Sequence, residues 1–311
     1  MQFFKKTTRI DFMSQRKLAM FVSIFLIIVA IGSLATRGLN FGIDFTGGTV
    51  LEVGYPQSAV LADVRSTLAK GGYDGASVQH FGTSKDVIVR IPPSDELSNA
   101  ELSNRVFATL KNETPEVVNR RIEFVGPQVG EELTQQGGLA LLWALFGILI
   151  YVFLRFSGKM AVGSVAALAH DVIIVLGFFS VLQLDFDLTV LAAVLAVIGY
   201  SLNDTIVVFD RIRENFRRLR KRNAVDAINI SINEMLSRTL ITSLTTILVL
   251  LALFFLGGEL IHNFASALLI GILIGTYSSI YVASTSALAL GLDKQDLKKV
   301  DKEGVDETPR S

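Results

Sequence analysis

An aspartate inside an apolar segment is the clearest chemical feature of this sequence. Residues 191–211, LAAVLAVIGYSLNDTIVVFDR, begin as a run long enough to enter a bilayer, and they place Asn203 and Asp204 within it. A carboxylate at the centre of a membrane helix costs about 2.5–3.5 kcal/mol on insertion scales, so we expect it to face a bundle interior and to serve a function. Tyr200 and Ser201 precede Asp204 by four and three residues, which predicts one polar stripe on the helix.

Fastening two helices is the alternative role for these polar side chains. A neutral asparagine would fasten helices at a lower cost than a carboxylate, which favours a functional role for Asp204. For Asn203 the fastening role carries at least equal weight. Asp210 lies where the basic residues begin, and we interpret it as a solvated helix end that can pair with Arg213.

Arg238 opens a later apolar segment and is the candidate partner of Asp204. An arginine at this place can also extend to the membrane surface, and the sequence alone leaves the two roles equal. Thr242, Thr245 and Thr246 follow on the same helical face, which strengthens the case for a polar path. An ion pair between Asp204 and Arg238 would lower the insertion cost of both, and protonating the carboxylate would release the arginine.

A second pair of ionisable residues, His170 and Asp171, lies in the middle of another apolar segment. Asp171 is either a member of a proton relay or a partner for a neighbouring helix, and we hold the two roles equal. Gly271 and Gly275 form a GxxxG pattern in the last apolar segment, and Ser279 extends this small face. The pattern predicts close helix packing rather than chemistry.

The composition places the chain among integral membrane proteins. Half of its 311 residues are apolar and 19% are charged. The net charge is zero, so nothing in the overall balance points to nucleic acid. There are no cysteines, and three scattered histidines do not suggest a metal site. The glycine-rich stretch 45–48 lacks the Lys-Ser/Thr of a phosphate-binding loop, so we interpret it as a turn. We therefore expect no cofactor, no metal and no enzyme activity.

Hydropathy predicts six membrane helices and an outward domain. The first helix covers residues 18–36, although Ser33-Leu34-Ala35 also resembles the cleavage site of a signal peptide. Five more form a bundle over residues 138–290, in apolar segments at 138–153, 161–182, 188–209, 240–256 and 264–290.

Basic residues predict the orientation of these helices. The links 155–159 and 211–238 hold two and eight basic residues, whereas 183–187 and 257–263 hold none. This alternation predicts that the leader 1–17, the basic loop 211–238 and the tail 291–311 are cytoplasmic, with both termini inside. The run RRLRKR at 217–222 can bind anionic membrane lipid or a ribosome, but we favour its role in setting the topology.

Residues 37–137 change character and predict a separate α+β domain outside the cytoplasm. Alternating apolar residues predict strands at 49–55, 76–81, 86–91 and 120–125, and period-four patterns predict helices at 58–70 and 99–111. The order β-α-β-β-α-β is that of a ferredoxin-like fold. The predicted fold class is therefore an α-helical integral membrane protein with six transmembrane helices and a ferredoxin-like extracytoplasmic domain between helices 1 and 2.

Three stretches resemble the SecD/SecF family of bacterial protein-export membrane proteins. They are FGIDFTGGTVLEV (41–53), FVGPQVGEEL (124–133) and VIGYSLNDTIVVFDRIREN (197–215). The family is similar in architecture to half of an exporter of the resistance-nodulation-division superfamily. In this family an aspartate of the fourth span and an arginine of the fifth are implicated in proton conduction. The resemblance implies that these roles fall on Asp204 and Arg238.

The resemblance also implies a setting and a set of partners. These are the six-span protein SecD, the SecYEG channel, YajC and a translocating preprotein, in the bacterial inner membrane. The implied activity is late-stage protein translocation driven by the proton motive force. Two alternatives remain open at this point: half of a proton-coupled exporter of small molecules or lipids, and a passive membrane assembly factor.

Overall fold

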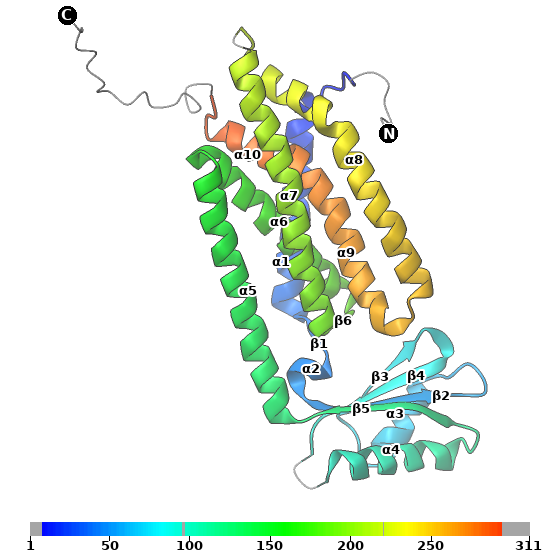
Figure 1. Cartoon of the computed structure of the whole chain (residues 1–311). Coiled ribbons are helices and arrows are strands. Elements are labelled where there is room, and N and C mark those ends of the chain that lie inside the picture. Colours follow the sequence, from blue (N-terminus) through cyan, green and yellow to red (C-terminus); the bar gives the residue numbers. More distant parts are fainter. Residues whose placement is uncertain (1–7, 95–96, 220, 294–311) are drawn as a thin grey trace, which may run out of the picture.

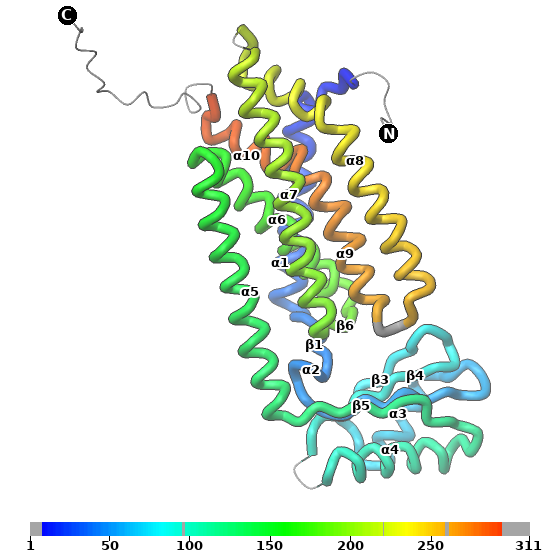
Figure 2. The backbone as a smooth tube through the Cα atoms, viewed as in Figure 1, coloured from blue at the N-terminus to red at the C-terminus, as the bar shows by residue number. Residues whose placement is uncertain are grey.

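A computed structural model describes residues 8–94, 97–219 and 221–293 of the chain. Within these ranges, six helices are long and apolar enough to cross a membrane. A smaller domain built on a β-sheet lies beyond one end of this helical bundle (Figure 1). The start of α1 and the end of α10 lie at the opposite end (Figure 2). The membrane helices are α1 (Arg16–Arg37), α5 (Pro127–Arg155), α6 (Gly158–Leu182), α7 (Leu188–Arg218), α8 (Ala224–Leu256) and α9 (Glu259–Ser278), which continues through the π-helical η2 (Ser279–Ala283) into α10 (Ser284–Ala289).

The helices extend further than hydropathy predicted. Helix α5 begins at Pro127, so the last part of the interval 37–137 belongs to the bundle. The interval 211–238, which we expected as a loop, is mostly helical, because α7 continues to Arg218 and α8 begins at Ala224. Glu234 binds Arg211 and Arg218 at 2.6 and 2.5 Å and so joins the two helices. The beginning of the leader and most of the tail lie outside the described residues.

An ion pair also joins α5 to α7. Asp210 accepts hydrogen bonds from the Arg155 guanidinium at 2.6 Å. Asp210 therefore pairs with Arg155 and not with Arg213, the partner that the sequence offered. The sequence could not show this contact, because Arg155 reaches Asp210 from another helix, α5.

The smaller domain, which we call the sheet domain, covers residues 48–125. Its four strands pair antiparallel in the order β3-β4-β2-β5, and two helices cover one face (Figure 1). Leu51, Val53, Val87 and Val89 are fully buried on that face, as their alternation in the sequence predicted. The elements are β2 (Gly48–Gly54), α3 (Leu61–Lys70), β3 (Ser77–Phe81), β4 (Thr83–Ile91), α4 (Asn99–Glu113) and β5 (Val118–Val125).

A small junction connects the bundle to the sheet domain. Two residues after α1, β1 (Asn40–Phe41) pairs parallel with β6 (Asp185–Phe186), which precedes α7. The short α2 (Ile43–Thr46) follows. Gly47 and Gly48 then have φ angles of +67° and +117°, a left-handed region that favours glycine, and so turn the chain into β2. The predicted turn at 45–48 is thus part of this junction.

Glycines bring α7 and α9 into close contact. A Cβ atom on Gly271 would lie 2.1 Å from the Val197 side chain, and one on Gly275 would lie 3.2 Å from Ser201 Cβ. The GxxxG pattern was therefore correctly interpreted as a packing face. This contact matters for the site, because Ser201 and Asp204 lie on the same helix, α7.

Candidate functional site in the membrane bundle

Asp204 lies inside the bundle, as expected for a carboxylate in an apolar segment. It is only 4% exposed on α7, and its Oδ2 atom has no hydrogen-bond partner within the described part of the chain. The start of α7 is fixed by two carboxylates. Asp187 accepts from the backbone N–H of Val190 at 2.8 Å, and Asp44 accepts from the N–H of Leu188 at 3.0 Å. These contacts anchor the helix that carries Asp204.

Arg238 does not form a direct ion pair with Asp204. The side chain is exposed on α8, and the described residues contain no Asp204–Arg238 ion pair within 4 Å. Thr242 is also exposed, and its hydroxyl donates to the Arg238 carbonyl of its own helix at 3.0 Å. The expected Asp–Arg pair is therefore not formed in this arrangement. Spacing placed both residues near one depth but did not fix where the long arginine side chain points.

Asp171 is the centre of the polar network in the bundle. Its carboxylate is fully buried on α6, and Oδ2 accepts hydrogen bonds from Ser201 of α7 at 2.5 Å and from Ser278 of α9 at 2.6 Å. His170 Nδ1 lies 2.8 Å from Oδ1, and its Nε2 has no partner among the described groups. Three helices therefore meet at one carboxylate. The π-helical turn η2, a type of distortion common at functional sites, begins one residue after Ser278.

Ser201 connects this network to Asp204. The two residues are three positions apart on α7, so they are neighbours on one helical face. Tyr200 is half-buried, and its hydroxyl has no partner among the residues described. Asn203 is exposed on the outside of the bundle, away from Asp171. Of the predicted stripe, Ser201 and Asp204 are buried in the bundle and Tyr200 is half-buried, whereas Asn203, which was not part of the stripe, faces outward.

The geometry suits proton storage and transfer better than metal binding or covalent catalysis. It offers two buried carboxylates, an imidazole and hydroxyls between them, which are the groups that build proton relays in membranes. The described residues contain no cluster of three or more His, Cys, Asp or Glu side chains that could hold a metal ion. Sequence reasoning missed Ser278. The signal available was its position three residues after Gly275, on the face that contacts α7.

Comparison with known protein families assigns the chain to one of them. Residues 105–293 match the family described as "Protein export membrane protein SecD/SecF, C-terminal", a range that contains Asp171, Asp204 and Arg238. Residues 32–59 match the "SecD/SecF GG Motif", which contains Gly47 and Gly48. The chain belongs to the SecD/SecF family.

Individual relatives agree with this assignment. A protein of Vibrio alginolyticus named protein translocase subunit SecF is 54% identical, with 99% of each chain covered. The protein of the same name in Escherichia coli O157:H7 is 46% identical, covering 96% of this chain and 93% of its own. The crystal structure of SecDF from Thermus thermophilus, described as a translocon-associated membrane protein, has a TM-score of 0.82 and 39% identity. It covers 91% of this chain, which spans 39% of that longer chain.

Proposed function

We propose that this chain is an accessory subunit of the Sec protein translocase that uses the proton motive force to drive late-stage translocation of preproteins. Membership of the SecD/SecF family and the SecF names of relatives that match almost end to end support the translocase assignment. They are named as transport components, in keeping with a protein that is not an enzyme. The proton-driven step is our inference from the buried carboxylates.

The buried state of Asp204 is the observation that carries the proton-driven step. A carboxylate that is 4% exposed, with one oxygen unpartnered and no direct ion pair in the described part of the chain, is costly to keep charged. Binding a proton removes that charge, and releasing it restores the attraction to Arg238. Ser201 then offers a hydrogen-bonded step towards Asp171 and His170. In this scheme Asp204, Asp171 and Arg238 form the relay.

The membrane field supplies enough energy for such a relay to do work. One charge crossing the membrane releases about 2.3 kcal/mol per 100 mV. Protonation can use that energy only if it biases a protein between two arrangements. Because α6, α7 and α9 all contribute to the Asp171 network, a change in its protonation alters the contact between three helices. The sheet domain at the end of the bundle is the element that we propose to move.

The outward polar side chains support a second six-span subunit. Asn203, Arg238 and Thr242 are exposed on membrane helices. Polar and charged groups at membrane depth face protein or water rather than lipid. A SecD subunit seated against α7 and α8 would cover them, and the similarity to the longer chain of the SecDF crystal structure supports that pairing. By family resemblance we extend the proposal to the SecYEG channel, YajC and the preprotein.

The basic loops support an orientation with both termini in the cytoplasm of a bacterium, in its inner membrane. The sheet domain then lies outside the cytoplasm, where late translocation takes place. Its β-α-β-β-α-β order and the sheet order β3-β4-β2-β5 support a ferredoxin-like fold. A domain of this position and size is suited to contact an emerging polypeptide.

Inverted membrane vesicles test this proposal. Translocation of a preprotein is measured with ATP held constant, with and without an uncoupler, for the wild type, Asp204→Asn and Asp204→Glu. We expect Asp204→Asn to insert and to assemble with SecD but to lose gradient-dependent stimulation, and Asp204→Glu to keep part of it. Arg238→Lys should remain partly active and Arg238→Met should not. Equal stimulation by the wild type and Asp204→Asn would instead support a passive assembly role.

A further inference from the structure

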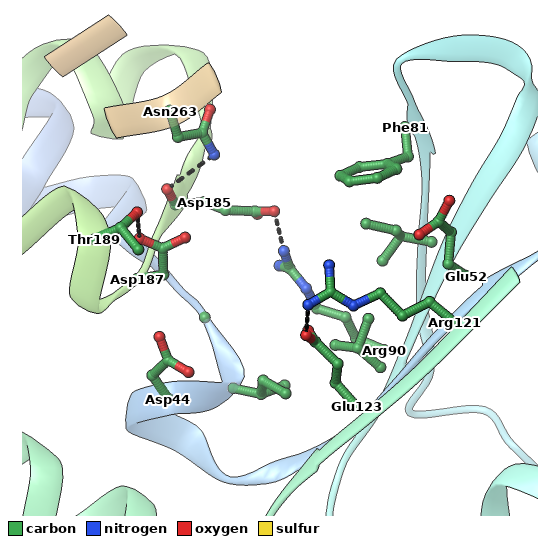
Figure 3. A pocket seen from close by; sticks show the side chains of 14 residues that line it. Asp44, Glu52, Phe81, Arg90, Arg121, Glu123, Asp185, Asp187, Thr189 and Asn263 are labelled. Carbon is green, nitrogen blue, oxygen red and sulfur yellow. Dashed lines mark hydrogen bonds and ion pairs between the residues drawn. The ribbon is translucent and has the colours of Figure 1, made fainter. Parts of the chain in front are cut away.

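The sheet domain presents an open, polar face to the membrane bundle. Helices α3 and α4 cover one face of the sheet, and the other face lines a cleft of about 320 Å³ against the outer end of the bundle (Figure 3). Ile88 and Arg90 of β4 lie on this open face, opposite in direction to the buried Val87 and Val89. One wall of the cleft is the sheet domain, and the other is the end of the bundle around β6 and the start of α7. The width of the cleft therefore depends on the contacts that hold these two walls together.

Asp185 of β6 joins the two walls of this cleft. Its Oδ2 atom forms an ion pair with Arg90 of the sheet domain (Figure 3). The same atom accepts a hydrogen bond from Nε2 of Gln79, also in the sheet domain, at 3.0 Å. On the bundle side, its Oδ1 atom accepts from Asn40 Nδ2 at 2.7 Å, and its carbonyl accepts from Asn263 Nδ2 at 3.2 Å. One side chain thus connects strands β3 and β4 to the junction that leads into α7.

The polypeptide connections lie elsewhere on the sheet. The chain enters the sheet domain at Gly48 of β2 and leaves it at Val125 of β5, and these two residues pair with each other. Directly beside them, a Cβ on Gly47 would lie 3.0 Å from Pro127 Cα. The domain is therefore tethered along β2 and β5, whereas Asp185 holds it through β3 and β4. Gly47 and Gly48, with positive φ angles, supply a joint about which the strands can turn.

We propose that Asp185 is a releasable clasp that holds the sheet domain closed on the bundle, with the paired connections at Gly47–Gly48 and Gly126–Pro127 as the hinge. The ion pair is suited to release because it is only partly buried, with Arg90 and Asp185 side chains 15% and 17% exposed. Its position also connects it to the membrane site. Asp185 lies two residues before Asp187, which caps the helix that carries Asp204. Only the connection between the clasp and the Asp204 site that would drive export rests on the proposed function.

Cysteine labelling in the purified complex with SecD, held in lipid nanodiscs, tests the clasp. The natural chain has no cysteine, so labelling of this chain, separated from SecD on a gel, reports only the introduced Ile88→Cys. Ile88 is 7% exposed and lines the cleft. Opening should raise its rate of reaction with a polar thiol reagent. Charged hydrogen bonds are strong enough that Arg90→Asp should raise this rate about tenfold. The exchanged pair Arg90→Asp with Asp185→Arg should restore the slow rate.

A core cysteine separates opening from unfolding. Val89→Cys points into the buried core of the same strand, where Val89 is 0% exposed, and it should stay unreactive in every background. The clasp is overturned if Ile88→Cys reacts equally fast with and without Arg90→Asp, or if Val89→Cys becomes reactive together with it. It is also overturned if the exchanged pair fails to slow the reaction. Because labelling is measured without translocation, its outcome is independent of the proton-relay test.

Discussion

Replacing Asp171 separates the structural role of the buried network from its proposed role in proton transfer. Three hydrogen bonds meet at this carboxylate, from Ser201, Ser278 and His170. Between membrane helices a hydrogen bond contributes about 0.6 kcal/mol on average. Asp171→Ala removes two such bonds between helices, from Ser201 and Ser278, and one within α6, from His170, so we expect it to lower the free energy of unfolding by about 1–2 kcal/mol. Loss of side-chain volume adds to this effect in the same direction.

Asp171→Asn should behave differently. Its carbonyl oxygen can accept from both serine hydroxyls, and its amide can donate to His170 Nδ1 in the other imidazole tautomer. We therefore expect the free energy of unfolding to change by less than about 1 kcal/mol, because the three hydrogen bonds remain. Gradient-dependent translocation should nevertheless fall, since asparagine does not take up and release a proton.

Unfolding in mixed micelles with a denaturing detergent, followed by circular dichroism, measures these changes. Ser164→Ala is the matched control, because Ser164 is buried on the same helix but donates to the Met160 carbonyl of its own helix at 3.1 Å. Its effect should be small. If Asp171→Ala destabilised the protein no more than Ser164→Ala does, the network would not hold α6, α7 and α9 together. Full translocation by Asp171→Asn would remove Asp171 from the relay.

Three further predictions follow from other parts of the molecule. Gly271→Leu should destabilise the bundle by about 1–3 kcal/mol through its clash with the valine of α7, measured by the same detergent unfolding, and a wild-type midpoint would contradict the close packing. Ser98→Ala should destabilise the isolated sheet domain by about 1 kcal/mol in urea, because Ser98 caps α4. Hydrogen bonds from Ser98 hold the pKa of Glu101 below its ordinary value. Since a lowered folded-state pKa stabilises above the unfolded pKa and that contribution is lost as pH falls, the difference between wild type and variant should shrink on acidification. In intact cells, an impermeant thiol reagent should label Ser84→Cys but not Asn223→Cys, and the reverse would overturn the orientation.

The sheet domain shows what local patterns can predict. Alternation of buried valines and leucines and two amphipathic helices predicted its six elements with bounds within a few residues. The pairing of Asn40–Phe41 with Asp185–Phe186 was not predicted, because two residues have no measurable period. For the same reason the role of Asp185, which depends on contacts from four different elements, left no signal in the sequence.

The membrane site shows the same division between local and long-range information. The cost of a charge in an apolar helix predicted correctly that Asp204 is buried in the bundle. Helical spacing could not decide the role of Asp171, because its two serine partners come from other helices. A lone serine is a weak signal, since its hydroxyl often bonds to its own helix. The predicted direct ion pair between Asp204 and Arg238 is not formed, because similar depth in the membrane does not determine the direction of a long side chain.

Infrared difference spectroscopy tests most directly whether Asp204 takes up and releases a proton. The protein, reconstituted with SecD in proteoliposomes, is compared before and after a proton gradient is imposed, in the region of the protonated carboxyl C=O stretch. We predict a band that changes with the gradient in the wild type, shifts in Asp204→Glu and disappears in Asp204→Asn. A gradient-dependent band that persists unchanged in Asp204→Asn would contradict the claim that this carboxylate is the site where the proton acts.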